Sequence, residues 1–127
     1  MITVHHLNNS RSQRVLWLLE ELELEYEIKH YSRDPKTGRA PLSLKSVHPL
    51  GRSPVITYRG KTIAETGAII EYIIREHGEG RLVPDIGTDD YDNYIHFLHF
   101  GEGSAMLPQL LALYTSFLGE ASAPLQP

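Results

Sequence analysis

The sequence contains no cysteine, so it can form neither a disulfide framework nor a Cys-X-X-Cys redox centre. Any thiol chemistry must therefore use a sulfur atom that a substrate brings. The chain also lacks an uninterrupted apolar run near the roughly 20 residues that span a bilayer. Polar side chains, including His5 and Asn8, interrupt its first residues, which is not the pattern of a signal peptide. We therefore expect a cytoplasmic protein with no membrane partner.

Positive charge is also scarce, because 12 basic residues stand against 16 acidic ones and the formal net charge is −4. A nucleic-acid surface needs clustered positive charge, so we expect no nucleic-acid partner. What the chain does have is an ordinary globular composition, with 41% hydrophobic residues in 127 positions. This is the length of one domain, and it can bury a core.

The segment from His48 to Tyr72 has the clearest local pattern. Two short apolar runs, Val55–Tyr58 and Lys61–Ala64, are separated by a turn that contains Gly60. Glycine supplies the positive φ that tight hairpin turns need, so the two runs are predicted to be paired strands. Pro54 lacks an N–H group and fits the start of a strand, where one missing ladder hydrogen bond is tolerated.

A helix is predicted from Thr66 to His77, with Gly78 as its C-terminal stop. Glu65 and Thr66 put a carboxylate and a hydroxyl at the helix N-terminus, where free N–H groups and the helix dipole attract anions. The two charged ends of an amino acid would fit there. The alternative interpretation is a simple helix cap with an acidic first turn.

The N-terminal residues predict a strand from Ile2 that stops near Leu7, followed by a helix and a second strand, Tyr26–Tyr31. Ser10 and Gln13 fit a capping box, with Ser10 as the N-cap of a helix that runs to about residue 23. A strand, a helix and a strand at this spacing form a right-handed βαβ unit, so the two strands should be parallel. The hairpin then completes a mixed four-stranded sheet.

The remaining segments are less regular. Residues 32–47 read as an irregular loop, in which residues 42–47 could form one or two helical turns. We predict a first domain over residues 1–78, a linker over 79–87, and the incomplete start of an all-helical domain over 88–127. Thr88 begins a long helix in this last part.

These residues carry a family resemblance. A loop of Gly51, a basic residue, any residue and Pro54, then an apolar strand, a hairpin and the pair Glu65-Thr66, resembles the glutathione-binding half of the glutathione transferases. The resemblance is dense over residues 1 to about 84 and weak beyond. It implies an α/β fold with a thioredoxin-like domain, βαβ then ββα, followed by a truncated all-helical domain.

The resemblance also implies a binding site for glutathione. Pro54 would be cis, and the main chain of Ser53 would pair with the cysteinyl part of glutathione. Glu65 and Thr66 would hold the γ-glutamyl end, and Arg52 stands where family members often carry a basic residue near the site. Without the resemblance, the alternative interpretations are an ordinary trans proline in a turn for Pro54 and a solvent-exposed loop charge for Arg52.

Ser10 is the candidate catalytic residue. It lies between the first strand and the first helix, where serine-type family members place the hydroxyl that stabilises the glutathione thiolate. Thiols are weak nucleophiles until ionised, and a hydroxyl donor with a helix N-terminus lowers their pKa. Ser12 and Asn9 are alternatives for the same role, and Ser10 could instead only cap the helix.

The function implied is conjugation of glutathione, as a co-substrate, to a small electrophile, which is a detoxification reaction. A non-catalytic glutathione-binding or protein-interaction module is the alternative. We expect a homodimer, because the apolar face of the long helix needs a cover. We expect no metal, since His96, His99 and Glu102 recur at spacing three without a ligand motif.

Overall fold

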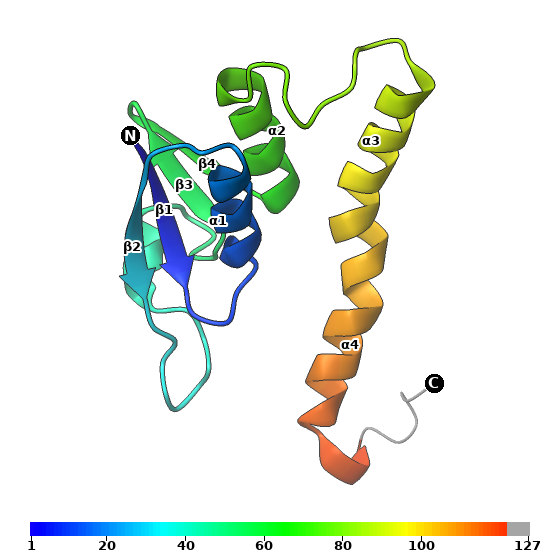
Figure 1. The fold of residues 1–127 in the computed structure, drawn as a ribbon. Helices are drawn as coiled ribbons and strands as arrows, with labels where there is room; N and C mark the ends of the chain where they lie inside the picture. The colour runs from blue at the N-terminus through cyan, green and yellow to red at the C-terminus, as the bar shows by residue number, and fades with distance from the viewer. Residues whose placement is uncertain (122–127) are drawn as a thin grey trace. The chain divides into compact units, whose positions relative to one another are not determined.

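The computed structural model describes residues 1–121, and it divides into two compact units, Met1–Leu82 and a second unit that begins at Val83. The first unit contains the sheet (Figure 1). In chain order, its elements are β1 (Ile2–Leu7), α1 (Ser12–Glu21), β2 (Tyr26–Tyr31), the 3-10 helix η1 (Leu42–Ser46), β3 (Val55–Tyr58), β4 (Lys61–Ala64) and α2 (Thr66–His77). This is the predicted thioredoxin-like order, βαβ then ββα.

The sheet has the strand order β2-β1-β3-β4. β1 and β2 are parallel along their whole length, whereas β1 with β3 and β3 with β4 are antiparallel, so the predicted mixed sheet is confirmed. The hairpin turn between β3 and β4 is formed by Arg59 and Gly60, whose φ angles are 47° and 76°. Two successive positive φ values match the twist of the flanking strands, which explains the tight connection.

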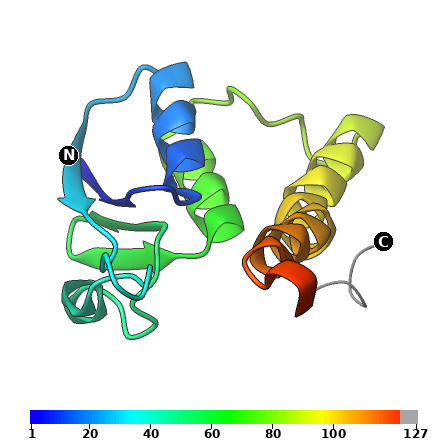
Figure 2. The ribbon, with the colours of Figure 1, turned by 90° about the horizontal axis from the view of Figure 1, so that it is seen from below.

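One face of the sheet is covered by α1 and α2, which lie side by side in Figure 2. Alternate strand residues point toward these helices, and the helices contribute one apolar stripe each. The cluster comprises Ile2, Val4, Val15, Leu19, Leu22, Ile56, Ile69, Tyr72 and Ile73. Burial of each large aliphatic side chain contributes about 1.5–3 kcal/mol, so this face is the main source of stability.

The opposite face carries a smaller cluster. Leu7, Tyr31 and Val55 point away from the helices and pack against Leu44 of η1. Leu44 is fully buried, so it attaches the long connection between β2 and β3 to the sheet. The helical turns predicted near residue 42 are therefore present and have a packing role.

Two sequence predictions about the helices are wrong. α1 begins at Ser12, its N-cap is Arg11 and no side chain caps it, so Ser10 is not the N-cap and the capping box does not form. Ser10 stands one residue before this N-cap, where its hydroxyl accepts from the backbone N–H of Ser12 and donates to Ser53 of another loop. α1 also ends at Glu21, because Glu23 adopts a left-handed conformation.

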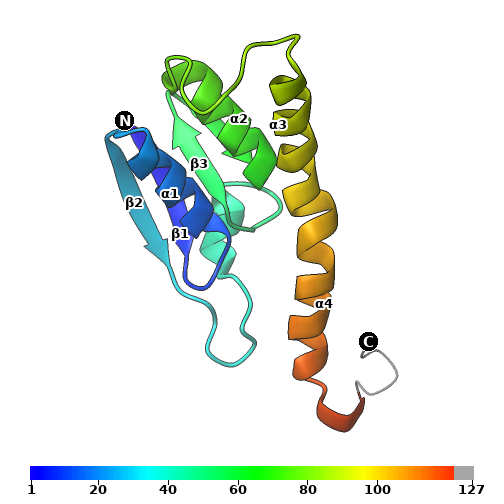
Figure 3. The same cartoon turned by 45° about the vertical axis from the view of Figure 1, so that its right-hand side comes forward.

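The second unit is a helical run of three segments, α3 (Asp89–Phe100), the π-helical turn η2 (Gly101–Ala105) and α4 (Met106–Ser116). The helical ribbon continues from α3 into α4 in Figure 3. Thr88 caps α3 as predicted, since its Oγ1 accepts a hydrogen bond from the backbone N–H of Tyr91 at 3.2 Å. Within residues 1–121, no helix is long and apolar enough to cross a membrane.

Candidate functional site

The predicted site residues gather at one edge of the sheet for a topological reason. β1 and β4 both run antiparallel to β3, so the ends of β1 and β4 meet the start of β3 at the same edge. Val55 pairs with Ala64, which sets Pro54 beside Glu65 one position beyond the ladder. Residues far apart in the chain, Ser10, Ser53 and Glu65, therefore follow or precede neighbouring strands.

The bond between Ser53 and Pro54 is cis, as predicted. Pro54 is buried, while Ser53 is half-buried and its hydroxyl donates a hydrogen bond to the carbonyl of His5 at 3.0 Å. This bond attaches the loop before β3 to strand β1. Arg52, the preceding residue, is exposed.

Ser10 is half-buried and joins two loops. Its hydroxyl donates to Ser53 Oγ at 3.3 Å, accepts from the backbone N–H of Ser12 at 3.3 Å, and lies 2.7 Å from Ser12 Oγ. A hydroxyl in this position is available to a ligand that lies against Ser53. The Ser10 hydroxyl therefore joins the start of α1 to the loop before β3.

The other two candidates for the same role are placed differently. Ser12 has no exposed surface, so its hydroxyl cannot reach a ligand without a rearrangement. Asn9 is exposed and left-handed, with φ of 50°, and its carbonyl accepts a hydrogen bond from Arg33 at 3.0 Å. Arg33 also donates to the carbonyl of Asn8 at 3.1 Å, so it holds the loop between β1 and α1.

Glu65 and Thr66 stand at the start of α2. Glu65 has φ of 75° and ψ of 126°, and its side chain makes no capping hydrogen bond, so the simple helix-cap interpretation is wrong for its carboxylate. A positive φ is unfavourable for a residue with a Cβ, and such strain is concentrated at functional sites. The Glu65 side chain is exposed, whereas Thr66 is buried.

Sequence reasoning missed two histidines of β1. His6 Nδ1 lies 2.8 Å from Ser12 Oγ, and the His6 ring packs edge-on against the His30 ring of β2 at 5.6 Å between centroids. Burial and the neighbouring His30 lower the pKa of His6. Side chains alternate between the two faces of a strand, so His6 lies on the same helix-covered face as Val4. This alternation could have indicated from the sequence that His6 faces α1.

His5 lies on the other face of β1 and is buried. Its Nδ1 is 2.9 Å from the Tyr31 hydroxyl, and its Nε2 is 3.2 Å from Thr57 Oγ1. Burial is the main cause that lowers the pKa of His5, and Lys29 adds to it. His5 therefore acts as a neutral bridge across three strands, β2, β1 and β3.

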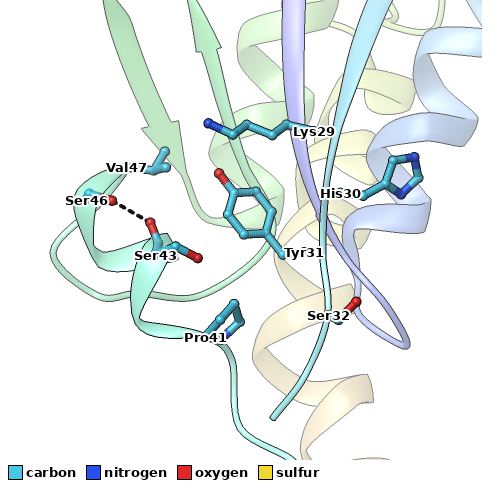
Figure 4. A pocket seen from close by; sticks show the side chains of 8 residues that line it. All are labelled: Lys29, His30, Tyr31, Ser32, Pro41, Ser43, Ser46 and Val47. Atoms are coloured by element: carbon cyan, nitrogen blue, oxygen red, sulfur yellow. Dashed lines mark hydrogen bonds between the residues drawn. The ribbon is translucent and has the colours of Figure 1, made fainter.

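A pocket of about 370 Å³ lies between β2 and η1 (Figure 4). Lys29 and Tyr31 line it from the strand, and Ser43 and Ser46 line it from η1. None of the predicted site residues lines this pocket. Among residues 1–121, no group of three or more His, Asp or Glu side chains is placed to hold a metal ion, and the His96 ring instead stacks on Phe100 at 6.0 Å.

The sequence matches a known family and known relatives. Residues 1–75 match the family described as "Glutathione S-transferase, N-terminal domain". Over 106 residues, the chain is 42% identical to the protein named glutathione S-transferase 3 of Schizosaccharomyces pombe, a match that covers 84% of this chain and 43% of that protein.

Solved structures agree with this match. A glutathione S-transferase from Actinobacillus pleuropneumoniae superposes with a TM-score of 0.77 at 38% identity, over 98% of this chain and 54% of that chain. A glutathione transferase from Phanerochaete chrysosporium, solved in complex with oxidized glutathione, has a TM-score of 0.73 at 26% identity, over 94% and 56% of the two chains. The chain thus spans about half the length of these relatives.

Proposed function

Because the chain belongs to the glutathione S-transferase family, we propose that it binds glutathione at the sheet edge and transfers it, as a thiolate, to small electrophilic substrates. The observation that carries the proposal is the contact of the Ser10 and Ser53 hydroxyls at 3.3 Å. This contact puts a hydrogen-bond donor beside the loop that would hold the cysteinyl part of glutathione.

Glutathione binding would use the main chain that precedes β3 and the residues that follow β4. The Ser53 main chain before cis-Pro54 would pair with the cysteinyl residue in the manner of an added strand, which recognises backbone. The exposed Glu65 carboxylate would bind the ammonium group of the γ-glutamyl residue, and Thr66 with the N-terminus of α2 would bind its carboxylate. Arg52 would add positive charge near the anionic tripeptide.

The solved complex of the P. chrysosporium relative with oxidized glutathione supports this choice of ligand. That protein shares the fold over 94% of this chain.

Ser10 would activate the sulfur. A free thiol has a pKa of about 8.5, so little of it is ionised at neutral pH. The Ser10 hydroxyl would donate a hydrogen bond to the sulfur and stabilise the thiolate, while the thiol proton leaves to water. A sulfur lone pair then attacks the electrophilic carbon, an S–C bond forms, and the leaving group departs with the electrons of its bond.

The alternative is a non-catalytic glutathione-binding or protein-interaction module. The chain matches 43% and 54% of the length of two relatives, and this match supports glutathione binding without choosing between the two functions. The half-buried Ser10 favours catalysis, since a module that only binds glutathione does not need a donor for its sulfur.

We further propose a cytoplasmic homodimer that acts in detoxification. The exposed apolar side chains of the second unit support association, because a large exposed apolar surface marks an interaction site. They include Phe97, Phe100, Leu107, Leu111, Leu113 and Tyr114.

One experiment separates binding from catalysis. Glutathione affinity is measured by calorimetry, and conjugation of glutathione to a generic aromatic electrophile is followed by absorbance, for the wild type and for Ser10→Ala. We expect binding in both proteins, and a turnover at neutral pH that is roughly 10²-fold lower in Ser10→Ala than in the wild type. Binding without turnover in the wild type would select the non-catalytic module, and absence of binding would reject both.

A further inference from the structure

Two side chains next to the proposed site, His6 and Ser12, have no role in the mechanism above. Ser12 contacts Ser10, and His6 contacts Ser12. Ser12 Oγ lies 2.7 Å from Ser10 Oγ on one side and 2.8 Å from His6 Nδ1 on the other. Ser12 has no exposed surface. Four side chains, from His6 to Ser53, are thus connected by successive hydrogen bonds.

The direction of these hydrogen bonds follows from the acceptor at one end. The His5 carbonyl can only accept, so Ser53 uses its single hydroxyl proton to donate to it at 3.0 Å. Ser53 Oγ must then accept from Ser10 at 3.3 Å.

Ser10 has now used its own proton, so the short contact with Ser12 needs the proton of Ser12. The remaining contact, between Ser12 Oγ and His6 Nδ1, needs a proton on the imidazole nitrogen.

We propose that His6, with its proton on Nδ1, and Ser12 are positioning residues that direct the Ser10 hydroxyl proton toward the bound glutathione sulfur. This inference rests on the function proposed for Ser10. His6 and Ser12 touch neither glutathione nor the electrophile, and they act only through Ser10.

The lengths of the contacts support this role. The Ser10 to Ser53 contact, at 3.3 Å, is longer than the 2.5–3.0 Å of ordinary hydroxyl hydrogen bonds, whereas the two contacts of the Ser12 hydroxyl, at 2.7 Å and 2.8 Å, are within that range. The long bond is the weak one. A thiolate is an anion and forms stronger, charge-assisted hydrogen bonds. It would therefore replace Ser53 as the acceptor of the Ser10 hydroxyl and leave the hydrogen bonds of Ser12 in place.

The surroundings of His6 keep it neutral. Its ring faces His30 of β2 and Ser12 of α1, and burial and His30 both lower its pKa. A neutral imidazole has one N–H group, and the hydrogen bond to Ser12 determines which nitrogen carries it. Protonation of His6 at low pH would add a proton to Nε2 and leave the Nδ1 hydrogen in place.

The first test measures the proton position directly. Nitrogen NMR of the intact protein, with labelled histidine and with or without glutathione, reports whether His6 Nδ1 carries a proton above the pKa of the ring. We expect a protonated Nδ1 and a bare Nε2 in both samples. A bare Nδ1 in the glutathione-loaded protein would overturn the inference, because Ser12 would then donate to His6 and Ser10 to Ser12.

The second test measures the consequence for glutathione. The pKa of the bound thiol is obtained from its thiolate absorbance for the wild type, Ser12→Ala and the control Ser43→Ala, an exposed serine of η1. In Ser12→Ala alone, the loss of one hydrogen bond between His6 and Ser10 should raise the pKa of the bound thiol by up to about one unit. This corresponds to a tenfold loss of thiolate. Equal values in all three proteins would overturn the inference.

The outcomes separate this inference from the proposed function. If the bound thiol of the wild type is as weakly acidic as free glutathione, the activation by Ser10 is wrong. If its pKa is lowered, rises in Ser10→Ala and does not change in Ser12→Ala, only the inference about His6 and Ser12 is wrong. The NMR measurement on the wild type remains decisive if Ser12→Ala does not fold.

Discussion

The hydroxyls of Ser10 and Ser53 meet at 3.3 Å although the two residues are 43 positions apart in the chain. Ser10 follows β1 and Ser53 precedes β3, and these two strands are antiparallel neighbours. The sheet therefore brings the residues of the proposed site together, because the end of one strand and the start of the next lie at the same edge.

Ser10→Ala should reduce conjugation at neutral pH by roughly 10²-fold, the lower range for loss of one preorganised donor. The Michaelis constant for glutathione should change much less, because Ser53, Glu65 and Thr66 remain. Activity should partly recover at alkaline pH, where the thiol ionises unaided. Steady-state rates against pH measure this.

Asn9→Gly is the matched control for that variant, since glycine keeps the left-handed φ of 50° and removes only the side chain. We expect nearly normal turnover in the control. Full neutral-pH activity in Ser10→Ala, or a large loss in Asn9→Gly, would assign the role elsewhere.

Glu65→Ala and Glu65→Gly should both weaken glutathione binding, because each removes the carboxylate proposed to hold the ammonium group. Their stabilities should differ. The φ of 75° is strained for alanine and not for glycine, so Glu65→Gly should unfold with a free energy about 1 kcal/mol higher than Glu65→Ala. Calorimetry and urea unfolding measure the two effects, and equal affinity to the wild type would remove Glu65 from the site.

Leu44→Ala should lower the free energy of unfolding by about 2–5 kcal/mol, because Leu44 is fully buried between η1 and the sheet. Leu42→Ala is the control, since Leu42 lies in the same 3-10 helix and is 79% exposed. It should change stability by less than about 0.5 kcal/mol. Urea unfolding monitored by circular dichroism compares them, and equal losses would contradict the packing role of Leu44.

Stability should fall as the pH is lowered below about 6.5, the ordinary pKa of histidine. Burial lowers the pKa of His5 in the folded state, so the unfolded chain binds more protons in this range and the free energy of unfolding rises with pH. The stability that neutral His5 contributes is complete above the pKa of the unfolded state, and it is lost as the pH falls through the lower pKa of the folded state.

Urea unfolding at several pH values, with His5→Asn beside the wild type, tests this linkage. His6, whose pKa is also lowered, contributes in the same direction, so the slope should decrease in His5→Asn without vanishing. An unchanged slope in His5→Asn would show that His5 is not the linked group.

The protein should self-associate at micromolar concentration through the apolar residues of α3 and α4. Phe97, which is 65% exposed, is a suitable probe, and Phe97→Lys should shift sedimentation toward the monomer. Leu50→Lys, at a similarly exposed leucine of the first unit, should not. A wild type that sediments only as a monomer would reject the dimer.

Local patterns in the sequence determined the elements of this protein. The two strands of the hairpin, the helix from Thr66 to His77 and the cap at Thr88 have the predicted bounds, because each depends on side chains within a few positions of one another. The strand–helix–strand spacing of β1, α1 and β2 likewise predicted a parallel pair, which the register confirms.

Tertiary structure decided the contacts of Ser10 and of His6. A serine two positions before a helix can cap it or turn away, and the choice depends on Ser53, which comes from a distant loop. His6 contacts Ser12 only because α1 packs back onto the face of the sheet that His6 shares with Val4. Hydrogen bonds between distant segments require the packed chain, so local spacing alone could not predict that the Ser10 hydroxyl would contact Ser53.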